Sequence, residues 1–226
     1  MPKPIAVVTG ASKGIGRAIA LRLAGDYEIV AVARSDELLE TLAQEIEQRG
    51  GACRPRVVDI TDAGAVAAAL AGIDAQVLVN NAGIGYVKPF LELTREEWRR
   101  MVDVNFNALF DVTRAVLPGM LARRSGHIVV IGSIAGRSAF VGGTGYAATK
   151  HAVMGFTENL MLEVRDAGVK VSVVNPGSVA TEFSTRRDPS WMLAAADVAD
   201  AVAHVLATPP HVLVHRVEIR ALSPKR

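Results

Sequence analysis

The chain has 226 residues, enough for one well-filled domain, and its evenly spread apolar segments give no reason to divide it. Hydrophobic residues make up 50% and charged residues 21%, while the net charge of +2 is too small to argue for a nucleic-acid or membrane-surface partner. Cys53 is the single cysteine, which excludes an internal disulfide. With no signal-peptide pattern and no apolar run of membrane-spanning length, we expect a soluble cytoplasmic protein.

Short β-branched runs alternate along the chain with longer amphipathic segments. Strands are predicted at residues 5–9, 28–33, 56–59, 76–80, 127–131, 170–175 and 212–219, with helices between them. Continuous apolar strands such as residues 128–131 fit burial on both faces, and the alternation implies parallel pairing through right-handed crossovers. The sequence therefore predicts one α/β domain over residues 1–226. We expect a doubly wound Rossmann fold with a parallel sheet of about seven strands and helices on both faces.

The first predicted strand leads directly into a glycine-rich loop. Its candidate nucleotide contacts are Gly10, Ser12, Lys13, Gly14, Ile15 and Gly16. Glycines let the backbone turn sharply and approach a pyrophosphate at a helix N-terminus. The spacing is GxxxGxG rather than GxGxxG, so a plain strand-to-helix turn is the alternative. The position, at the first strand-to-helix junction of a doubly wound sheet, favours dinucleotide binding.

The residues after the second predicted strand bear on the choice of cofactor. An acidic residue there would bind the adenosine ribose of NAD, but the strand is followed by Arg34. Arg34 can bind a 2′-phosphate bidentately and Lys13 can add a second positive charge, so NADP(H) is predicted over NAD(H). In the alternative, Arg34 is solvated and Asp36 contacts the ribose. Asp59, after the third strand, either accepts a hydrogen bond from the adenine amino group or caps the following helix.

Tyr146 and Lys150 are four residues apart, a spacing that puts a phenol and an ammonium on one face of a helix. A neighbouring cation favours the phenolate and so brings the phenol closer to service as an acid or base. The alternative is an exposed aromatic residue beside a solvated lysine. The wider pattern of the chain decides between these interpretations.

Several motifs follow one another along the chain in a fixed order. They are the glycine loop, residues 80–83 (Asn-Asn-Ala-Gly), Asn105, Ser133, Tyr146, Lys150 and residues 175–177 (Asn-Pro-Gly). This arrangement resembles the short-chain dehydrogenase/reductase family over nearly the whole chain. The resemblance implies that Tyr146 is the general acid/base and that Ser133 binds the reacting oxygen, with a helix cap as the alternative for Ser133. It implies that Lys150 lowers the tyrosine pKa and holds the nicotinamide ribose, and that Asn105 orders a water. No metal is required.

The same resemblance implies further cofactor contacts. They are Ile60, Asn81, Ala82, Gly83, Pro176, Gly177, Val179 and Thr181, together with Tyr146 and Lys150. Residues 80, 82 and 83 are expected to form a narrow backbone passage beside the cofactor, with a sheet-stabilising turn as the alternative role. The Thr181 hydroxyl is expected to meet the nicotinamide carboxamide.

The substrate is less well indicated. A substrate lid predicted near residues 182–194 is short, which favours a small or extended substrate over a steroid. Residues 209–222 are similar to the subgroup acting on serine and 3-hydroxy acids, and unlike the acyl-carrier-protein reductases. Arg137, Arg186 and Arg187 are candidates for binding a substrate carboxylate, with solvated side chains as the alternative.

We therefore expect an NADP(H)-dependent oxidoreductase acting on a small alcohol or carbonyl substrate, with 3-hydroxy acids and serine-like compounds as candidates. The alternatives are a 3-oxoacyl or other carbonyl reductase and, in another class, a catalytically silent NADP-sensing or scaffold protein. The apolar-faced helices predicted at residues 98–121 and 146–164 suggest a homodimer or homotetramer. Family members pair such helices and add a second interface, which here would run over residues 197–221.

Overall fold

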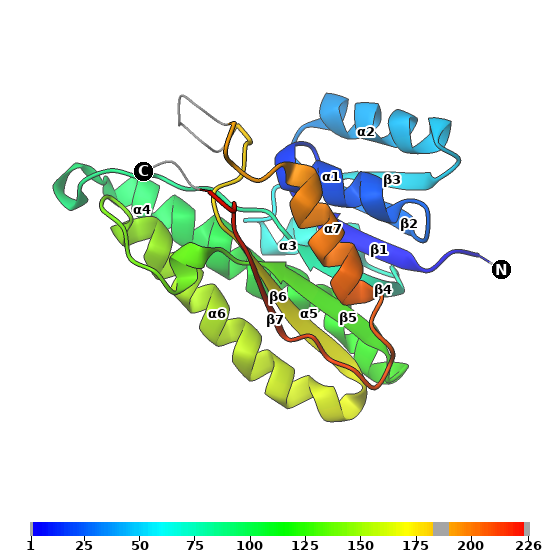
Figure 1. Cartoon of the computed structure of the whole chain (residues 1–226). Helices are drawn as coiled ribbons and strands as arrows, with labels where there is room; N and C mark the ends of the chain where they lie inside the picture. The colour runs from blue at the N-terminus through cyan, green and yellow to red at the C-terminus, as the bar shows by residue number, and fades with distance from the viewer. Residues whose placement is uncertain (1, 183–189, 224–226) are drawn as a thin grey trace.

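The structure is a computed structural model that describes residues 2–182 and 190–223. The described residues form a seven-stranded sheet in the order β3-β2-β1-β4-β5-β6-β7, and every adjacent pair is parallel. The strands are β1 (Ile5–Thr9), β2 (Glu28–Ala33), β3 (Ala52–Val57), β4 (Ala75–Asn80), β5 (Gly126–Ile131), β6 (Val169–Pro176) and β7 (Arg216–Ile219). The predicted doubly wound Rossmann fold is confirmed (Figure 1).

Helices cover both faces of this sheet (Figure 1). They are α1 (Gly14–Leu23), α2 (Asp36–Gln48), α3 (Ala63–Leu70), α4 (Arg95–Val102), α5 (Ala108–Ala122), α6 (Thr144–Val164) and α7 (Ala195–Leu206), with short 3₁₀ turns at η1 (Phe90–Glu92), η3 (Ile134–Gly136) and η4 (Arg165–Ala167). One apolar cluster packs α1, α2 and α7 against the sheet, and the other packs α3, α5 and α6. Continuous apolar strands are buried because both of their faces lie under helices.

Two strands differ from their predicted bounds by more than one residue at an end. The strand predicted at residues 56–59 is β3, which begins at Ala52 and ends at Val57. It is an edge strand that pairs only with β2, so it needs no continuous apolar run and tolerates Pro55, which lacks a backbone N–H. The last strand was predicted to begin at Val212, but β7 begins at Arg216 because the backbone N–H of Val212 is bonded to Pro209 in a turn.

The helix predicted over residues 98–121 is interrupted. It begins earlier, at Arg95, where the Thr94 hydroxyl and the Glu97 carboxylate form a reciprocal capping box. A π-helical segment, η2 (Asp103–Asn107), then separates α4 from α5. Such a segment inserts an extra residue into a turn and commonly marks a functional site. Asn105 lies within it, so the interruption turns this asparagine toward the loop after β4.

A buried histidine links the last three strands at the end of the sheet remote from the glycine loop. His127 of β5 is 7% exposed, and its Nε2 lies 2.8 Å from the Ser172 hydroxyl of β6. Ser172 donates in turn to the Val214 carbonyl, before β7. Burial, with a smaller contribution from the nearby Lys170 ammonium, lowers the pKa of His127 to about 4. The imidazole is therefore neutral in the folded protein at neutral pH.

This histidine predicts a pH dependence of stability. Because its pKa is about 4 in the folded protein and 6.5 ordinarily, the unfolded chain binds the extra proton as pH falls through that window, and stability is lost on acidification. We expect the free energy of unfolding to fall by about 2 kcal/mol more in the wild type than in His127→Gln between pH 7 and pH 5. Urea unfolding measures both variants at one protein concentration. Equal losses would contradict the assignment.

Candidate active site

A cleft of ≈ 1140 Å³ opens where the strands end at their carboxyl sides. Gly10 follows β1, Arg34 follows β2, Asn81 follows β4 and Gly132 follows β5, and all four line it. The sheet order reverses between β1 and β4, and a doubly wound sheet binds ligands in the crevice at that switch point. The topology therefore places the cleft at the expected position for a dinucleotide.

Most of the residues predicted to form the site line this cleft. They are Gly10, Ser12, Lys13, Gly14, Ile15, Arg34, Asp59, Ile60, Asn81, Ala82, Gly83, Ser133, Tyr146, Lys150, Pro176, Gly177, Val179 and Thr181. Gly16 and Asn105 do not line it, because both are buried behind its surface. The structure thus brings together residues from seven separate stretches of the chain.

The glycine loop is packed closely against its neighbours. A Cβ atom at Gly16 would overlap the carbonyl oxygen of Gly10, so only glycine fits there. The Asn81 side chain donates to the Thr9 carbonyl at 2.9 Å, and its backbone N–H donates to the Thr9 hydroxyl at 3.0 Å. These bonds tie the loop after β4 to the end of β1, which supports the sheet-stabilising role for this turn; the narrow passage beside the cofactor stays a prediction.

Two cations lie at the adenosine end of the cleft. Arg34 is 62% exposed, with Nη1 4.0 Å from Asp59 Oδ2, and Lys13 is 54% exposed, with Nζ 3.1 Å from Glu182 Oε2. Exposed pairs of this kind contribute little free energy, so both cations are available to an incoming anion. The structure thus places both cations at one cleft, and their role in binding a phosphate stays a prediction.

Asp59 does not cap the following helix. Its Oδ1 accepts hydrogen bonds from the Thr61 backbone N–H and hydroxyl, and these bonds lower the pKa of the carboxyl, with smaller contributions from Arg34 and Arg100. The cap of α3 is Asp62, which accepts the Ala65 N–H at 2.9 Å. The capping alternative for Asp59 is therefore wrong, and the adenine contact stays a prediction.

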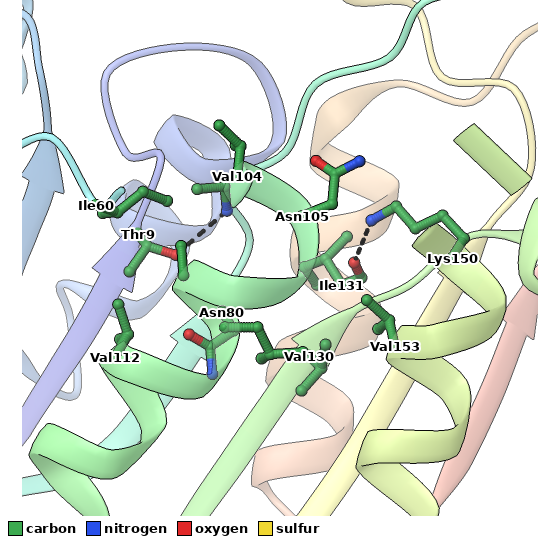
Figure 2. Close-up of a pocket in the computed structure, with 13 residues that line it drawn as sticks. Thr9, Ile60, Asn80, Val104, Asn105, Val112, Val130, Ile131, Lys150 and Val153 are labelled. Carbon is green, nitrogen blue, oxygen red and sulfur yellow. Dashed lines mark hydrogen bonds between the residues drawn. The ribbon is translucent and has the colours of Figure 1, made fainter. Parts of the chain in front are cut away.

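At the other end of the cleft, Tyr146 and Lys150 lie one turn apart on α6, as predicted. The Lys150 ammonium is 5.8 Å from the centre of the Tyr146 ring and donates to the Ile131 carbonyl at 3.0 Å (Figure 2). The Ser133 hydroxyl, at the end of β5, is hydrogen-bonded to the Tyr146 side chain. Ser133 also caps η3 by accepting the Ala135 N–H, so the interpretations as a site residue and as a cap both describe it.

Burial is the main influence on the pKa values of Tyr146 and Lys150. Burial raises the pKa of Tyr146 above its ordinary value, and the hydrogen bond from Ser133 opposes that rise. Burial also lowers the pKa of Lys150 to about 8. Desolvation of the phenolate is thus the largest influence on the pKa of Tyr146, and the Lys150 ammonium is bonded to Ile131; the prediction that Lys150 lowers the tyrosine pKa stays a prediction.

Asn105 binds to backbone and side chain at once. Its Oδ1 accepts the Ile84 N–H, and its Nδ2 donates to the Ile84 carbonyl, each at 2.8 Å. Nδ2 also donates to the Thr149 hydroxyl, at 3.0 Å. Figure 2 shows Asn105 and Lys150 reaching one small cavity of ≈ 10 Å³ from two helices. That volume is about the space of one water, and the predicted water at Asn105 stays a prediction.

Several cleft residues were not predicted. Glu96, Arg99, Arg100 and Asp103 of the α4 region line the adenosine end, and Val87, Phe140 and Val141 line the side near Tyr146. The Lys88 N–H donates to the Gly142 carbonyl at 3.1 Å, which joins the loops that carry the three apolar residues. No local sequence pattern predicts that these residues line the cleft. The loop of Val87 and the loop of Phe140 and Val141 are far apart in sequence and meet only in the folded chain.

Of the proposed carboxylate ligands, the structure describes only Arg137, and it does not place that residue in the site. Arg137 is exposed and is not among the residues that line the cleft. Arg186 and Arg187 lie outside the described residues, as does most of the predicted lid; Val179, near its start, forms a bridge with Leu193, near its end. Over residues 2–182 and 190–223, no helix is long and apolar enough to cross a membrane, and no three metal-ligating side chains are grouped.

Comparison with known proteins agrees with this geometry. Residues 4–190 match the family model for short chain dehydrogenase. The NADP-dependent 3-hydroxy acid dehydrogenase YdfG of Salmonella typhi is 35% identical over 95% of this chain and 94% of its own. Among solved structures, an alcohol dehydrogenase from the archaeon Thermococcus sibiricus, complexed with 5-hydroxy-NADP, has a TM-score of 0.91 and 31% identity, over 99% of this chain and 100% of its own.

A serine dehydrogenase from Escherichia coli is also similar, with a TM-score of 0.87 and 32% identity, over 98% of this chain and 100% of its own. The similarity thus extends over nearly the whole chain in sequence and in structure. This protein is a member of the short-chain dehydrogenase family.

Proposed function

We propose that this protein is an NADP(H)-dependent oxidoreductase that interconverts a small alcohol and its carbonyl compound, with Tyr146 as general acid/base. The observation that carries the proposal is the position of Tyr146, which lines the cleft within hydrogen-bond reach of Ser133 and one helical turn from Lys150. Relatives named as NADP-dependent, and a structural neighbour complexed with an NADP derivative, support the choice of cofactor.

The cleft fits such a cofactor. Its glycine loop has no room for a Cβ at Gly16, and its adenosine end carries Arg34 and Lys13. The residues that would hold the cofactor are the predicted contacts that line the cleft: Gly10, Ser12, Lys13, Gly14, Ile15, Arg34, Asp59, Ile60, Asn81, Ala82, Gly83, Tyr146, Lys150, Pro176, Gly177, Val179 and Thr181. When bound, the nicotinamide supplies or accepts a hydride. Arg34 and Lys13 would bind the 2′-phosphate, which NAD lacks.

The chain's own part in the reaction is to orient the substrate and move one proton. During reduction the carbonyl oxygen gains negative charge, and the Tyr146 hydroxyl gives it a proton; during oxidation the phenolate removes the alcohol proton. The Ser133 hydroxyl stabilises the developing charge on that oxygen. The nearby Lys150 ammonium favours the phenolate that remains after reduction, although burial acts against it.

Two substrate classes remain in competition. The names of the relatives favour 3-hydroxy acids and serine-like compounds. A second candidate, another carbonyl reductase, is favoured by the apolar wall of the cleft formed by Val87, Phe140 and Val141, which are 58%, 43% and 97% exposed. Such a wall suits a substrate with an uncharged aliphatic substituent, because apolar contact there removes nonpolar surface from water.

Matched acids and esters distinguish the two classes. If 3-hydroxy acids are the substrates, turnover of 3-hydroxybutyrate with NADP should exceed that of its methyl ester by about tenfold in kcat/KM, because a bound carboxylate contributes a charge-assisted bond that the ester lacks. The reverse ratio would favour the second candidate. Turnover of neither compound, nor of serine, sugars or aliphatic alcohols, would favour the catalytically silent NADP-sensing alternative.

A matched pair of surface variants locates the wall. Val141→Ser would lower kcat/KM for the ester if its side chain contacts the substrate. Leu91→Ser is the control, because Leu91 is 94% exposed and does not line the cleft. Equal effects of the two variants would show that the wall makes no substrate contact.

A further inference from the structure

The hydrogen bonding at the end of β5 changes in kind at Ser133. The Gly132 N–H donates to the backbone carbonyl of Val174 at 2.8 Å, as expected between parallel strands. The next N–H, that of Ser133, donates instead to a side chain, Asn175 Oδ1, at 3.1 Å. At the end of β5, where Ser133 lines the cleft, the hydrogen-bond acceptor on β6 is thus the side-chain amide of Asn175 and no longer a backbone carbonyl.

The surroundings of Asn175 are built around this bond. Asn175 is 1% exposed, and a Cβ atom at Gly132 would overlap its Oδ1, so the glycine is needed for the approach. Its Nδ2 is buried and has no hydrogen-bond partner among the described atoms. An unpaired buried donor is destabilising, so stability alone does not favour an asparagine here. The bond to Ser133 is the contact that distinguishes it from an apolar residue of similar size.

Ser133, whose backbone is held by Asn175, also contacts Tyr146, the proposed acid/base. With an extended backbone, at φ −171° and ψ 155°, it places its hydroxyl to accept the Ala135 N–H at 3.1 Å. The same hydroxyl is hydrogen-bonded to Tyr146, on α6. Ser133 is therefore hydrogen-bonded to Asn175 through its backbone N–H and to the phenol through its hydroxyl. Asn175 itself does not line the cleft.

We propose that Asn175 is a positioning residue: its side-chain oxygen holds the Ser133 backbone so that the Ser133 hydroxyl meets Tyr146 and the reacting oxygen. This inference rests on the proposed function, because it assigns Asn175 a role through Ser133 and Tyr146. It differs from a purely structural role in one respect. Replacing Asn175 would alter the proton-transfer step, whereas loosening β6 elsewhere would alter only stability.

The experiment is a double-mutant cycle on kcat with Asn175→Leu, Ser133→Ala and the double variant. Leucine keeps the size of the side chain and removes the acceptor. We expect Asn175→Leu to lower kcat about tenfold, as the loss of one positioning hydrogen bond would. We expect the double variant to be no slower than Ser133→Ala alone, because both changes act through one hydroxyl. Independent, multiplicative losses would overturn the proposal.

The pH profile and the binding of NADPH give further readouts. The Ser133 hydrogen bond holds the pKa of Tyr146 down, so Asn175→Leu should move the rising limb of kcat for alcohol oxidation to higher pH. NADPH affinity, measured by fluorescence titration, should stay within about twofold, since Asn175 lies outside the cleft. An unshifted limb, or a loss of NADPH affinity matching the loss of kcat, would contradict the positioning role.

Two variants separate positioning from folding. Ser172→Ala removes other buried hydrogen bonds of β6, to Val214 and to His127, at a residue that does not line the cleft, and should lower stability without lowering kcat. Asn175→Asp keeps an acceptor for the Ser133 N–H and should recover most of the kcat lost in Asn175→Leu. A loss of kcat in Ser172→Ala equal to that in Asn175→Leu, or no recovery in a folded Asn175→Asp, would overturn the proposal. If Tyr146→Phe retained activity, the proposed function itself would fail.

Discussion

Tyr146→Phe is expected to lower kcat for NADP-dependent turnover by about 10²- to 10⁴-fold, the usual contribution of a positioned general acid or base. The substitution removes only the hydroxyl, which is hydrogen-bonded to Ser133 and lies in a cleft beside the Lys150 ammonium. NADPH affinity should change little, because the residues proposed to bind its phosphates, Arg34, Lys13 and the glycine loop, are unchanged. Steady-state nicotinamide absorbance and a fluorescence titration of NADPH measure the two quantities.

Tyr27→Phe is the matched control. Tyr27 is a half-buried tyrosine that packs against the apolar core and does not line the cleft. Its variant should retain full activity. Activity of Tyr146→Phe within tenfold of the wild type, with a folded protein, would exclude Tyr146 as the acid/base and return attention to another proton donor in the cleft.

Arg34→Ala is expected to raise KM for NADP by roughly 10- to 100-fold while changing KM for NAD by less than about threefold, the loss expected for one charge-assisted contact. Arg34 lines the cleft beyond β2 and is paired only weakly, at 4.0 Å, with Asp59. Because the two cofactors differ only in the 2′-phosphate, the ratio of the KM values isolates that contact. Initial rates with each cofactor at saturating substrate give the ratio.

Arg22→Ala is the control for the loss of an arginine. Arg22 is 48% exposed and paired with Asp200, and it does not line the cleft. Lys13→Ala should act in the same direction as Arg34→Ala, and added salt should weaken NADP binding more than NAD binding. An equal rise in KM for both cofactors in Arg34→Ala would show that Arg34 contacts a group common to NAD and NADP.

Much of the architecture could be predicted because it depends on local order. Apolar runs of strand length alternate with amphipathic segments, and this alternation in a single chain leaves few topologies other than a parallel doubly wound sheet. The glycine loop could be placed because it directly follows the first strand, and Tyr146 could be placed beside Lys150 because four residues make about one helical turn. Each inference needs only neighbours in sequence.

The features that the sequence did not predict depended on neighbours distant in sequence. β3 is an edge strand whose bounds follow from pairing with β2, and the interruption of the helix at Asn105 follows from its bonds to Ile84 and Thr149. The pKa of Tyr146 is raised by burial, which no spacing reveals. Arg137 does not line the cleft, because the orientation of its loop depends on packing and not on local sequence.

Local residue patterns were thus sufficient for the family, the sheet and the residue types of the site, because helical and strand periodicities operate over a few residues. Only the tertiary structure decided which of the candidate residues line the cleft, which hydroxyl is bonded to Tyr146 and which side-chain amide accepts the Ser133 N–H. Those contacts join β5, β6 and α6, and they form only when the sheet and its helices exclude water from between them.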